Sequence, residues 1–197
     1  DHIEAASYIS LCAACGGDLE IVGKISPHNY WMARRVFERL GQTFTLKPDY
    51  IQVKSDRNLE IVPDFGNLIP VISDGPWPQL PSDMMSCLIT VATQVKGNVL
   101  FFEKMFESRL YFVDKLIAMG ANAVACDPHR VLISGPAKLH GSEIPSPDIR
   151  AGMALIIAAC CAEGESVVKN ADMVYRGYSA LPEKLRSLGC IIEEVEQ

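Results

Sequence analysis

Three aspartates open three apolar stretches of this chain. Asp1, Asp83 and Asp148 each precede an apolar run that ends at a glycine. A carboxylate at such a position can cap the first turn of a helix, because its oxygens accept hydrogen bonds from free backbone N–H groups. Arg150 begins an otherwise apolar helix, where an unpaired guanidinium would be costly. The sequence therefore predicts charged side chains at the starts of three helices that point at one face.

The spacing of these aspartates indicates an internal repeat. Each unit contains an apolar stretch, a short β-rich run, an amphipathic stretch and a second β-rich run. A period this long, with one helix–strand–helix–strand unit per repeat, indicates a repeat architecture. We therefore expect a single domain over residues 1–197, built from three repeats at about 1–82, 83–147 and 148–197.

The patterns within the repeats predict an α/β fold. The first helix of each unit is apolar nearly all round, as in Met153–Ala159, and must be buried. The second helix is amphipathic, so we expect central helices surrounded by sheets, with outer helices exposed to solvent. Helices are expected at 3–15, 30–40, 83–95, 110–119, 149–161 and 178–187. Strands are expected at 19–22, 43–46, 50–53, 98–102, 123–126, 131–134, 166–169 and 190–195.

The third unit lacks the second strand of its hairpin, because the chain ends after the strand expected at 190–195. An unpaired strand edge invites association, so we expect the missing strand to come from elsewhere in a longer protein. Residues 63–81 are rich in Pro, Asp and Gly, and are expected to form a surface excursion between the first two units.

Composition and charge argue against several functions. The net charge of −6 argues against a nucleic-acid partner, and the apolar run Met153–Ala162 is too short to span a membrane. Seven cysteines, an odd number, fit reduced thiols in a cytoplasmic protein. Cys12 and Cys15 lie among alanines on an expected helix, which favours packing over redox chemistry. The four histidines show no metal-ligand spacing with the cysteines, so we expect neither a metal nor a cofactor.

Several segments resemble motifs of the enolpyruvyl transferases. In chain order they are Asp1–Ala5, Pro81–Met84, Phe102–Arg109 and Asp148–Ala151. The first of them is similar to the interdomain linker of that family. Arg176–Tyr178, followed by 183–189, is similar to the branch that acts on UDP-N-acetylglucosamine in peptidoglycan precursor synthesis. The resemblance implies an inside-out α/β barrel of two domains, of which this chain is the C-terminal part and the N-terminal domain is its partner.

The resemblance implies transfer of enolpyruvyl from phosphoenolpyruvate to the 3-hydroxyl of UDP-N-acetylglucosamine, with release of phosphate. The reaction proceeds by addition and elimination through a tetrahedral intermediate. It needs a base near the hydroxyl, an acid at the methylene carbon and cations around the negative charge. By this resemblance Asp83 binds the sugar hydroxyl and removes its proton, and the backbone of Met105 meets the sugar nucleotide.

The same resemblance places charged residues around phosphoenolpyruvate. Arg109, Arg150 and Arg176 would gather there, because planar bidentate guanidinium groups suit phosphate and carboxylate. Asp148 would position this cluster. Without the resemblance, helix capping is the simpler interpretation of Asp83 and Asp148, and Arg109 and Arg176 could equally be surface or loop residues.

Three positions depart from the family pattern. His2 stands where arginine is usual, Ser108 where asparagine is common, and Tyr175 where aspartate usually precedes the arginine. A divergent or non-catalytic paralogue is therefore an alternative. So is the shikimate-pathway relative, which carries glutamate where this chain has Phe106. The family's substrate-binding lysine and its cysteine acid lie in the other domain, so we expect this chain alone to be inactive.

Overall fold

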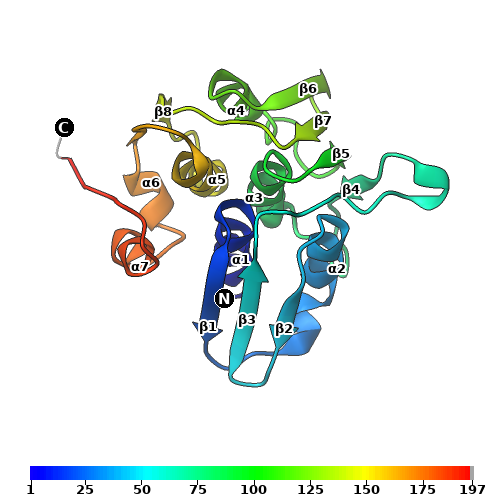
Figure 1. Ribbon diagram of the computed structural model, residues 1–197, viewed down its shortest axis with the longest axis horizontal. Coiled ribbons are helices and arrows are strands. Elements are labelled where there is room, and N and C mark those ends of the chain that lie inside the picture. The colour runs from blue at the N-terminus through cyan, green and yellow to red at the C-terminus, as the bar shows by residue number, and fades with distance from the viewer. Residues whose placement is uncertain (196–197) are drawn as a thin grey trace.

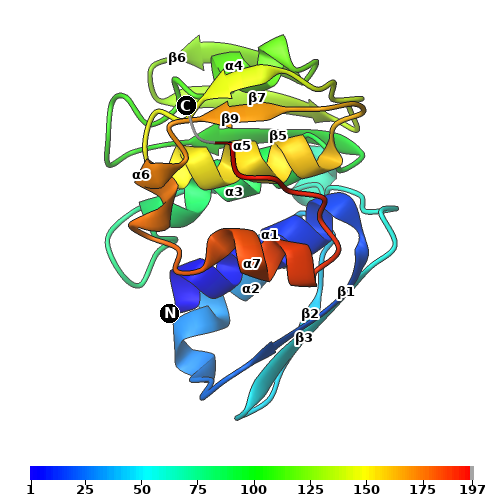
Figure 2. The same cartoon turned by 90° about the vertical axis from the view of Figure 1, so that its left-hand side faces the viewer.

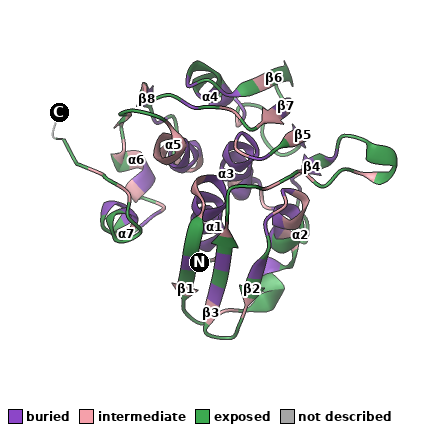
Figure 3. Cartoon of the chain, in the orientation of Figure 1, coloured by how far each residue is buried: buried purple, intermediate pink, exposed green. Residues whose placement is uncertain are grey.

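Three apolar helices form the centre of the fold. The structure, a computed structural model, describes residues 1–195. The central helices are α1 (His2–Cys15), α3 (Ser82–Ala92) and α5 (Ile149–Cys161), and each packs against the other two (Figure 1). Figure 2 shows them lying side by side, and Figure 3 shows that they are mostly buried. The predicted arrangement of central helices without a polar face is confirmed.

Three sheets surround these helices (Figure 1). The first is antiparallel with the order β1-β3-β2, and the second has the order β4-β5-β7-β6, in which β4 alone runs parallel to its neighbour. The third pairs β8 with β9 in parallel. The strands are β1 (Gly17–Val22), β2 (Phe44–Leu46), β3 (Tyr50–Ser55), β4 (Val71–Ser73), β5 (Gly97–Phe102), β6 (Asn122–Asp127), β7 (Arg130–Gly135), β8 (Glu143–Pro145) and β9 (Val167–Lys169).

Alternating residues turn one face of each large sheet towards the core. In β3, Ile51 and Val53 are fully buried, whereas Gln52 between them is exposed. In β5, Val99 and Phe101 are fully buried in the same way. This period of two follows from the pleat of a strand, and it places the apolar face of each sheet on the central helices.

The second helix of each unit is shorter than predicted. These helices are α2 (Trp31–Arg39), α4 (Val113–Ala118) and α7 (Leu181–Ser187); 3-10 turns occupy Pro27–Tyr30 and Phe65–Asn67. Pro182 fits the first turn of α7, where its missing N–H costs nothing, and so favours the later start. None of the helices described is both long and apolar enough to cross a bilayer.

A further short helix, α6 (Asp172–Tyr175), packs on α5 because of Gly152. A Cβ atom at this glycine would collide with the side chains of Ser146 and Val174. The close approach brings the segment after α6, including Tyr178, over the start of α5.

Three sequence predictions need correction. Residues 63–81 are not only a surface excursion, because they contain strand β4. Strand β8 was not predicted. Both strands have three residues, which is too short to show an alternating pattern. The strand expected at 190–195 is wrong: within the described part of the chain this segment pairs with no strand. Arg186 holds it instead, by hydrogen bonds to the Ile192 carbonyl (2.9 Å) and the Glu194 carboxylate (3.3 Å).

The cysteines are free thiols in varied surroundings. Cys12 and Cys87 are buried, and burial raises the pKa of each to about 11. A buried thiol with a raised pKa is a poor nucleophile. The structure therefore favours the packing interpretation of Cys12.

Candidate functional site

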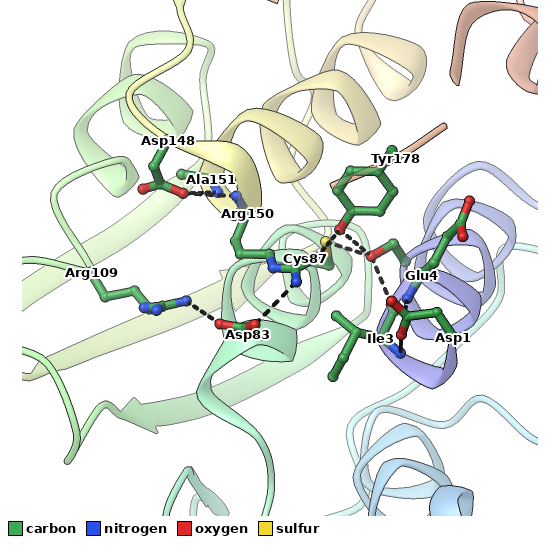
Figure 4. Close-up of polar contacts among 11 residues, drawn as sticks. Asp1, Ile3, Glu4, Asp83, Cys87, Arg109, Asp148, Arg150, Ala151 and Tyr178 are labelled. Atoms are coloured by element: carbon green, nitrogen blue, oxygen red, sulfur yellow. Dashed lines mark hydrogen bonds and ion pairs between the residues drawn. The ribbon is translucent and has the colours of Figure 1, made fainter. Parts of the chain in front are cut away.

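The residues at the starts of α1, α3 and α5 lie near one another, as the sequence had predicted for the charged groups (Figure 4). Asp1 caps α1 and Asp148 caps α5, since the side chain of each accepts hydrogen bonds from two N–H groups of the first turn. Asp83 does not cap α3. The cap position there is taken by Pro81, so Asp83 lies within the first turn with its carboxylate free for other contacts.

The Asp83 carboxylate lies between two guanidinium groups (Figure 4). Its Oδ1 is 3.0 Å from Arg109 Nη1, and its Oδ2 is 3.1 Å from Arg150 Nη2. The Asp83 side chain is 41% exposed, whereas the two arginines are only 20% and 21% exposed. One carboxylate and two guanidinium groups leave a surplus of one positive charge, in a geometry that suits a phosphate or carboxylate ligand.

Tyr178 holds Arg150 in place from behind. Its hydroxyl accepts a hydrogen bond from Arg150 Nη1 (3.3 Å) and forms a second one with Ser7 Oγ (2.8 Å). The guanidinium carbon also lies 5.6 Å from the centre of the tyrosine ring. Burial lowers the pKa of Arg150, but Tyr178 and Asp83 outweigh it and leave that pKa raised. Arg150 is thus a fixed, permanent cation.

In the sequence, Tyr178 was only the last residue of the Arg176–Tyr178 motif and was given no role of its own. Ser7 was missed as well, although it is a buried hydroxyl in an apolar helix, which is the signal that could have found it. The two residues belong to opposite ends of the chain. No local pattern could have paired them.

Arg109 is held by the loop that carries it. Its guanidinium carbon lies 4.8 Å from the centre of the Phe106 ring, which is half exposed. A cation over an aromatic face is attracted to it. The ring and Asp83 together orient Arg109 towards the starts of the helices.

Of the predicted site residues, Asp83, Arg109 and Arg150 are in direct contact, and Asp148 adjoins them through the backbone N–H of Arg150 (2.8 Å). Arg176 is different: it is exposed, and within residues 1–195 its side chain makes no ion pair or hydrogen bond. Its predicted place beside the other arginines stays a prediction; the adjacent Gly177 does lie against Arg150, whose Nη1 would be 3.7 Å from a Cβ atom added at that glycine. It follows α6 on the exposed loop that leads to Tyr178.

Met105 lies on the exposed loop before Arg109, and the residue is 45% exposed. Its backbone N–H donates to Glu103 Oε1 (3.0 Å). The carbonyl of Met105 is therefore the backbone group that could meet a ligand. The predicted contact with a sugar nucleotide stays a prediction.

The three departures from the family pattern lie outside the contacts of Asp83. The His2 ring packs edge-on against Tyr30 at 6.5 Å between ring centres, and the Tyr175 hydroxyl donates to Glu194 (3.3 Å). Ser108 is exposed on the loop next to Arg109.

Among residues 1–195, no group of three or more His, Cys, Asp or Glu side chains is placed to hold a metal ion.

Replacing Tyr178 by phenylalanine tests the support of Arg150. We expect the affinity of the site for inorganic phosphate to fall about tenfold, because a hydrogen bond to a charged group is worth roughly 1.5–3 kcal/mol. Calorimetric titration with phosphate measures the effect. Ser7→Ala is the matched control: it removes the other partner of the hydroxyl but leaves the contact with Arg150, so its phosphate affinity should stay near wild type. Equal losses in both variants would contradict the role given to Tyr178.

Comparisons with known proteins give one family. The family model of EPSP synthase (3-phosphoshikimate 1-carboxyvinyltransferase) matches residues 1–185. A UDP-N-acetylglucosamine 1-carboxyvinyltransferase of Treponema denticola is 48% identical over 197 residues, which are 100% of this chain and 46% of that protein. The protein of the same name from Bradyrhizobium diazoefficiens is 49% identical with the same coverage. The chain thus spans about half the length of the curated relatives it matches.

Solved structures show the same fold at lower identity. The enolpyruvyl transferase NikO from Streptomyces tendae superposes with a TM-score of 0.84 and 24% identity, covering 99% of this chain and 44% of that one. EPSP synthase from Acinetobacter baumannii gives a TM-score of 0.76 and 18% identity, with coverage of 100% and 47%. These likenesses concern the fold alone.

Proposed function

Because the chain belongs to the enolpyruvyl transferase family, the family of EPSP synthase (3-phosphoshikimate 1-carboxyvinyltransferase), we propose that it forms part of the active site of a UDP-N-acetylglucosamine 1-carboxyvinyltransferase. The family resemblance seen in the motifs is confirmed. The proposed reaction moves enolpyruvyl from phosphoenolpyruvate to the 3-hydroxyl of the sugar nucleotide and releases phosphate. It would supply a peptidoglycan precursor in the cytoplasm.

The observation that carries this proposal is the Asp83 carboxylate between Arg109 and Arg150. Phosphoenolpyruvate brings a phosphate and a carboxylate, and guanidinium groups bind both in bidentate fashion. When the arginines bind these anions, the Asp83 carboxylate is released to accept the proton of the sugar hydroxyl. The hydroxyl oxygen then attacks C2 of phosphoenolpyruvate while C3 gains a proton, which gives the tetrahedral intermediate. Elimination removes one proton from C3 and breaks the C2–O bond to phosphate, so that the double bond is restored and phosphate leaves.

The arginines also stabilise the charge of that intermediate. Their positions are set before substrate arrives, by Tyr178 for Arg150 and by the Phe106 ring for Arg109. Donors fixed in advance cost no reorganisation during the reaction, which is where electrostatic catalysis gains most. The free first-turn N–H groups of α3 add partial positive charge at the same end.

The acceptor is proposed from the names of the relatives and from one residue of the family resemblance. The curated relatives at 48% and 49% identity are named for UDP-N-acetylglucosamine. By the resemblance, Phe106 stands where the shikimate-pathway relative carries a glutamate, and here its ring supports Arg109. A glutamate at this position would place a second carboxylate beside the arginine and alter the charge of the site.

The test is phosphate release from phosphoenolpyruvate by the full-length protein that contains this chain. We expect release when UDP-N-acetylglucosamine is added and none above background with shikimate 3-phosphate. Release with shikimate 3-phosphate alone would favour the shikimate-pathway reaction. If no phosphate is released with either acceptor, both enzymatic proposals are contradicted and a non-catalytic paralogue is favoured.

We also propose that the site is shared with the rest of a longer protein, which would supply a phosphoenolpyruvate-binding lysine and the acid for C3. The 197-residue chain by itself should therefore release no phosphate with either acceptor. The measurement is a long incubation at high enzyme concentration, with the full-length protein as positive control. Turnover by the isolated chain would show that the residues described above suffice for the chemistry.

A further inference from the structure

Two carboxyl groups, Asp74 and Glu103, are completely buried beneath the loop that carries Met105 and Arg109. Asp74 Oδ1 accepts the backbone N–H of Lys104 at 2.6 Å. Glu103 Oε1 accepts the backbone N–H groups of Met105 and Phe106 at 3.0 and 3.1 Å. Three successive amides at the base of the loop are therefore held by two buried acids.

The remaining oxygen of each acid has an unusual position. Asp74 Oδ2 and Glu103 Oε2 are both buried, and neither finds a donor among the described residues. The two acids are neighbours across the sheet, because each directly follows the last paired residues of β4 and β5, Ser73 and Phe102. Two ionised carboxylates placed side by side repel, whereas a proton on one of them lets it donate a hydrogen bond to the other. A single shared proton would satisfy both orphan oxygens.

Other charged groups nearby face away from this pair. The Lys104 ammonium bonds Ser73 Oγ (2.9 Å) and lies over the Phe102 ring. His129 Nδ1 contacts the backbone carbonyl of Glu103, at 2.9 Å, not its carboxyl group. Asp127 is paired with Arg130. Within residues 1–195, no cation therefore compensates the buried acids.

We propose that Asp74 and Glu103 share one proton and act as positioning residues for the loop 104–109, which presents Met105 and Arg109 to the substrates. The proposal rests on the proposed function for its effect on catalysis. The loop amides are fixed at its base by the acids, and Arg109 is fixed at its far end by Phe106 and Asp83. If the two acids no longer held the loop amides, Arg109 could move with the loop, although the groups that Arg109 itself contacts would be unchanged.

The pH dependence has a defined sign. Burial, followed by the hydrogen bond with Asp74, raises the pKa of Glu103 to about 7 from its ordinary value of 4.5. Stability from this group is fully present below pH 4.5 and is lost as the pH rises through about 7. The loop should therefore loosen as the pH rises past neutrality, when Glu103 loses its proton.

The test compares Glu103→Gln with Glu103→Ala in the full-length protein. Glutamine keeps the acceptor oxygen for Met105 and Phe106, and its amide can donate to Asp74 without a titrating proton. Glu103→Ala removes both functions. The first readout is hydrogen exchange of the amides at 104–106 without substrate, with each variant compared with wild type at equal pH. The second readout is kcat and KM for phosphate release.

We expect faster exchange and at least a tenfold lower kcat/KM in Glu103→Ala, and near-wild-type values in Glu103→Gln. In wild type the exchange protection should weaken above pH 7 relative to Glu103→Gln. Equal behaviour of the two variants, or unchanged exchange in Glu103→Ala, would overturn the proposal. If Glu103→Ala does not fold, the pH comparison of wild type with Glu103→Gln decides alone. If the wild-type protein releases no phosphate but its amides at 104–106 exchange as predicted, the proposed function is rejected and the positioning role of the acids is kept.

Discussion

Asp83→Asn should lower kcat of the full-length enzyme by about a thousandfold, within the range that a lost general base commonly costs. Asparagine keeps the size of the side chain and one oxygen for Arg109 or Arg150, but it cannot take the proton of the sugar hydroxyl. Removing the negative charge leaves the two arginines without their counter-ion, so binding of phosphoenolpyruvate should not weaken. The loss should therefore appear in kcat rather than in KM for phosphoenolpyruvate.

The matched control is Asp1→Asn, the same chemical change at the corresponding start of the first repeat. Asp1 caps α1 and contacts neither arginine, and asparagine caps helices about as well as aspartate. Its activity should stay near wild type. If Asp83→Asn loses less than about tenfold, Asp83 is not the base. In that case its role is to hold Arg109 and Arg150 in place as their shared counter-ion.

Arg150→Lys should have the second-largest effect, with kcat/KM falling by about a hundredfold or more, as when a positioned charge stabiliser is removed. Lysine keeps a positive charge but lacks the planar fork that reaches Asp83 and Tyr178 together. Because Asp83 is 41% exposed, solvent screens the pair. The loss of folding stability should be about 1–2 kcal/mol, less than for a fully buried pair.

Steady-state kinetics and thermal unfolding together measure this prediction. Arg34→Lys is the matched control, since Arg34 also pairs with a carboxylate, Glu38 at 2.9 Å, but on the exposed side of α2. An exposed pair of this kind contributes about 0–1 kcal/mol, and Arg34 lies outside the site. An Arg150→Lys enzyme with full activity would show that charge alone suffices at this position and that the Tyr178 contact has no catalytic value.

The sequence was sufficient where local signals agreed. Helix α5 spans Ile149–Cys161 as expected, because Asp148 supplies a cap immediately before an unbroken apolar run. The hairpin of the second unit was also located correctly to within one residue at each end, since its turn residues separate two β-rich runs. Burial of the central helices followed from their lack of a polar face.

The difference between Asp83 and Asp148 was harder to see. Both follow a proline-containing turn, but Pro147 directly precedes Asp148, whereas Pro81 precedes Asp83 by two positions. The helix in the second unit starts at Ser82, so Asp83 falls inside the first turn and cannot cap it. A helix capped by Asp83 would start at Met84, so a start two residues earlier converts a capping residue into one that binds two arginines.

The contacts between distant segments could not be predicted at all. Tyr178 meets Ser7 across 171 residues of sequence, and Asp74 lies opposite Glu103 through the pairing of β4 with β5. Each pair depends on how the repeats pack, and neither partner carries a local pattern that names the other. The family resemblance supplied the candidate charges, whereas only the structure shows which side chains hold them.

The most direct measurement follows a carbon-13 label from phosphoenolpyruvate in the presence of UDP-N-acetylglucosamine and the full-length protein. The account predicts a vinyl ether carbon attached to the sugar nucleotide, with coupling to the proton at its 3-position, and one phosphate released for each group transferred. Label that stays in phosphoenolpyruvate, or that appears as free pyruvate, would contradict it.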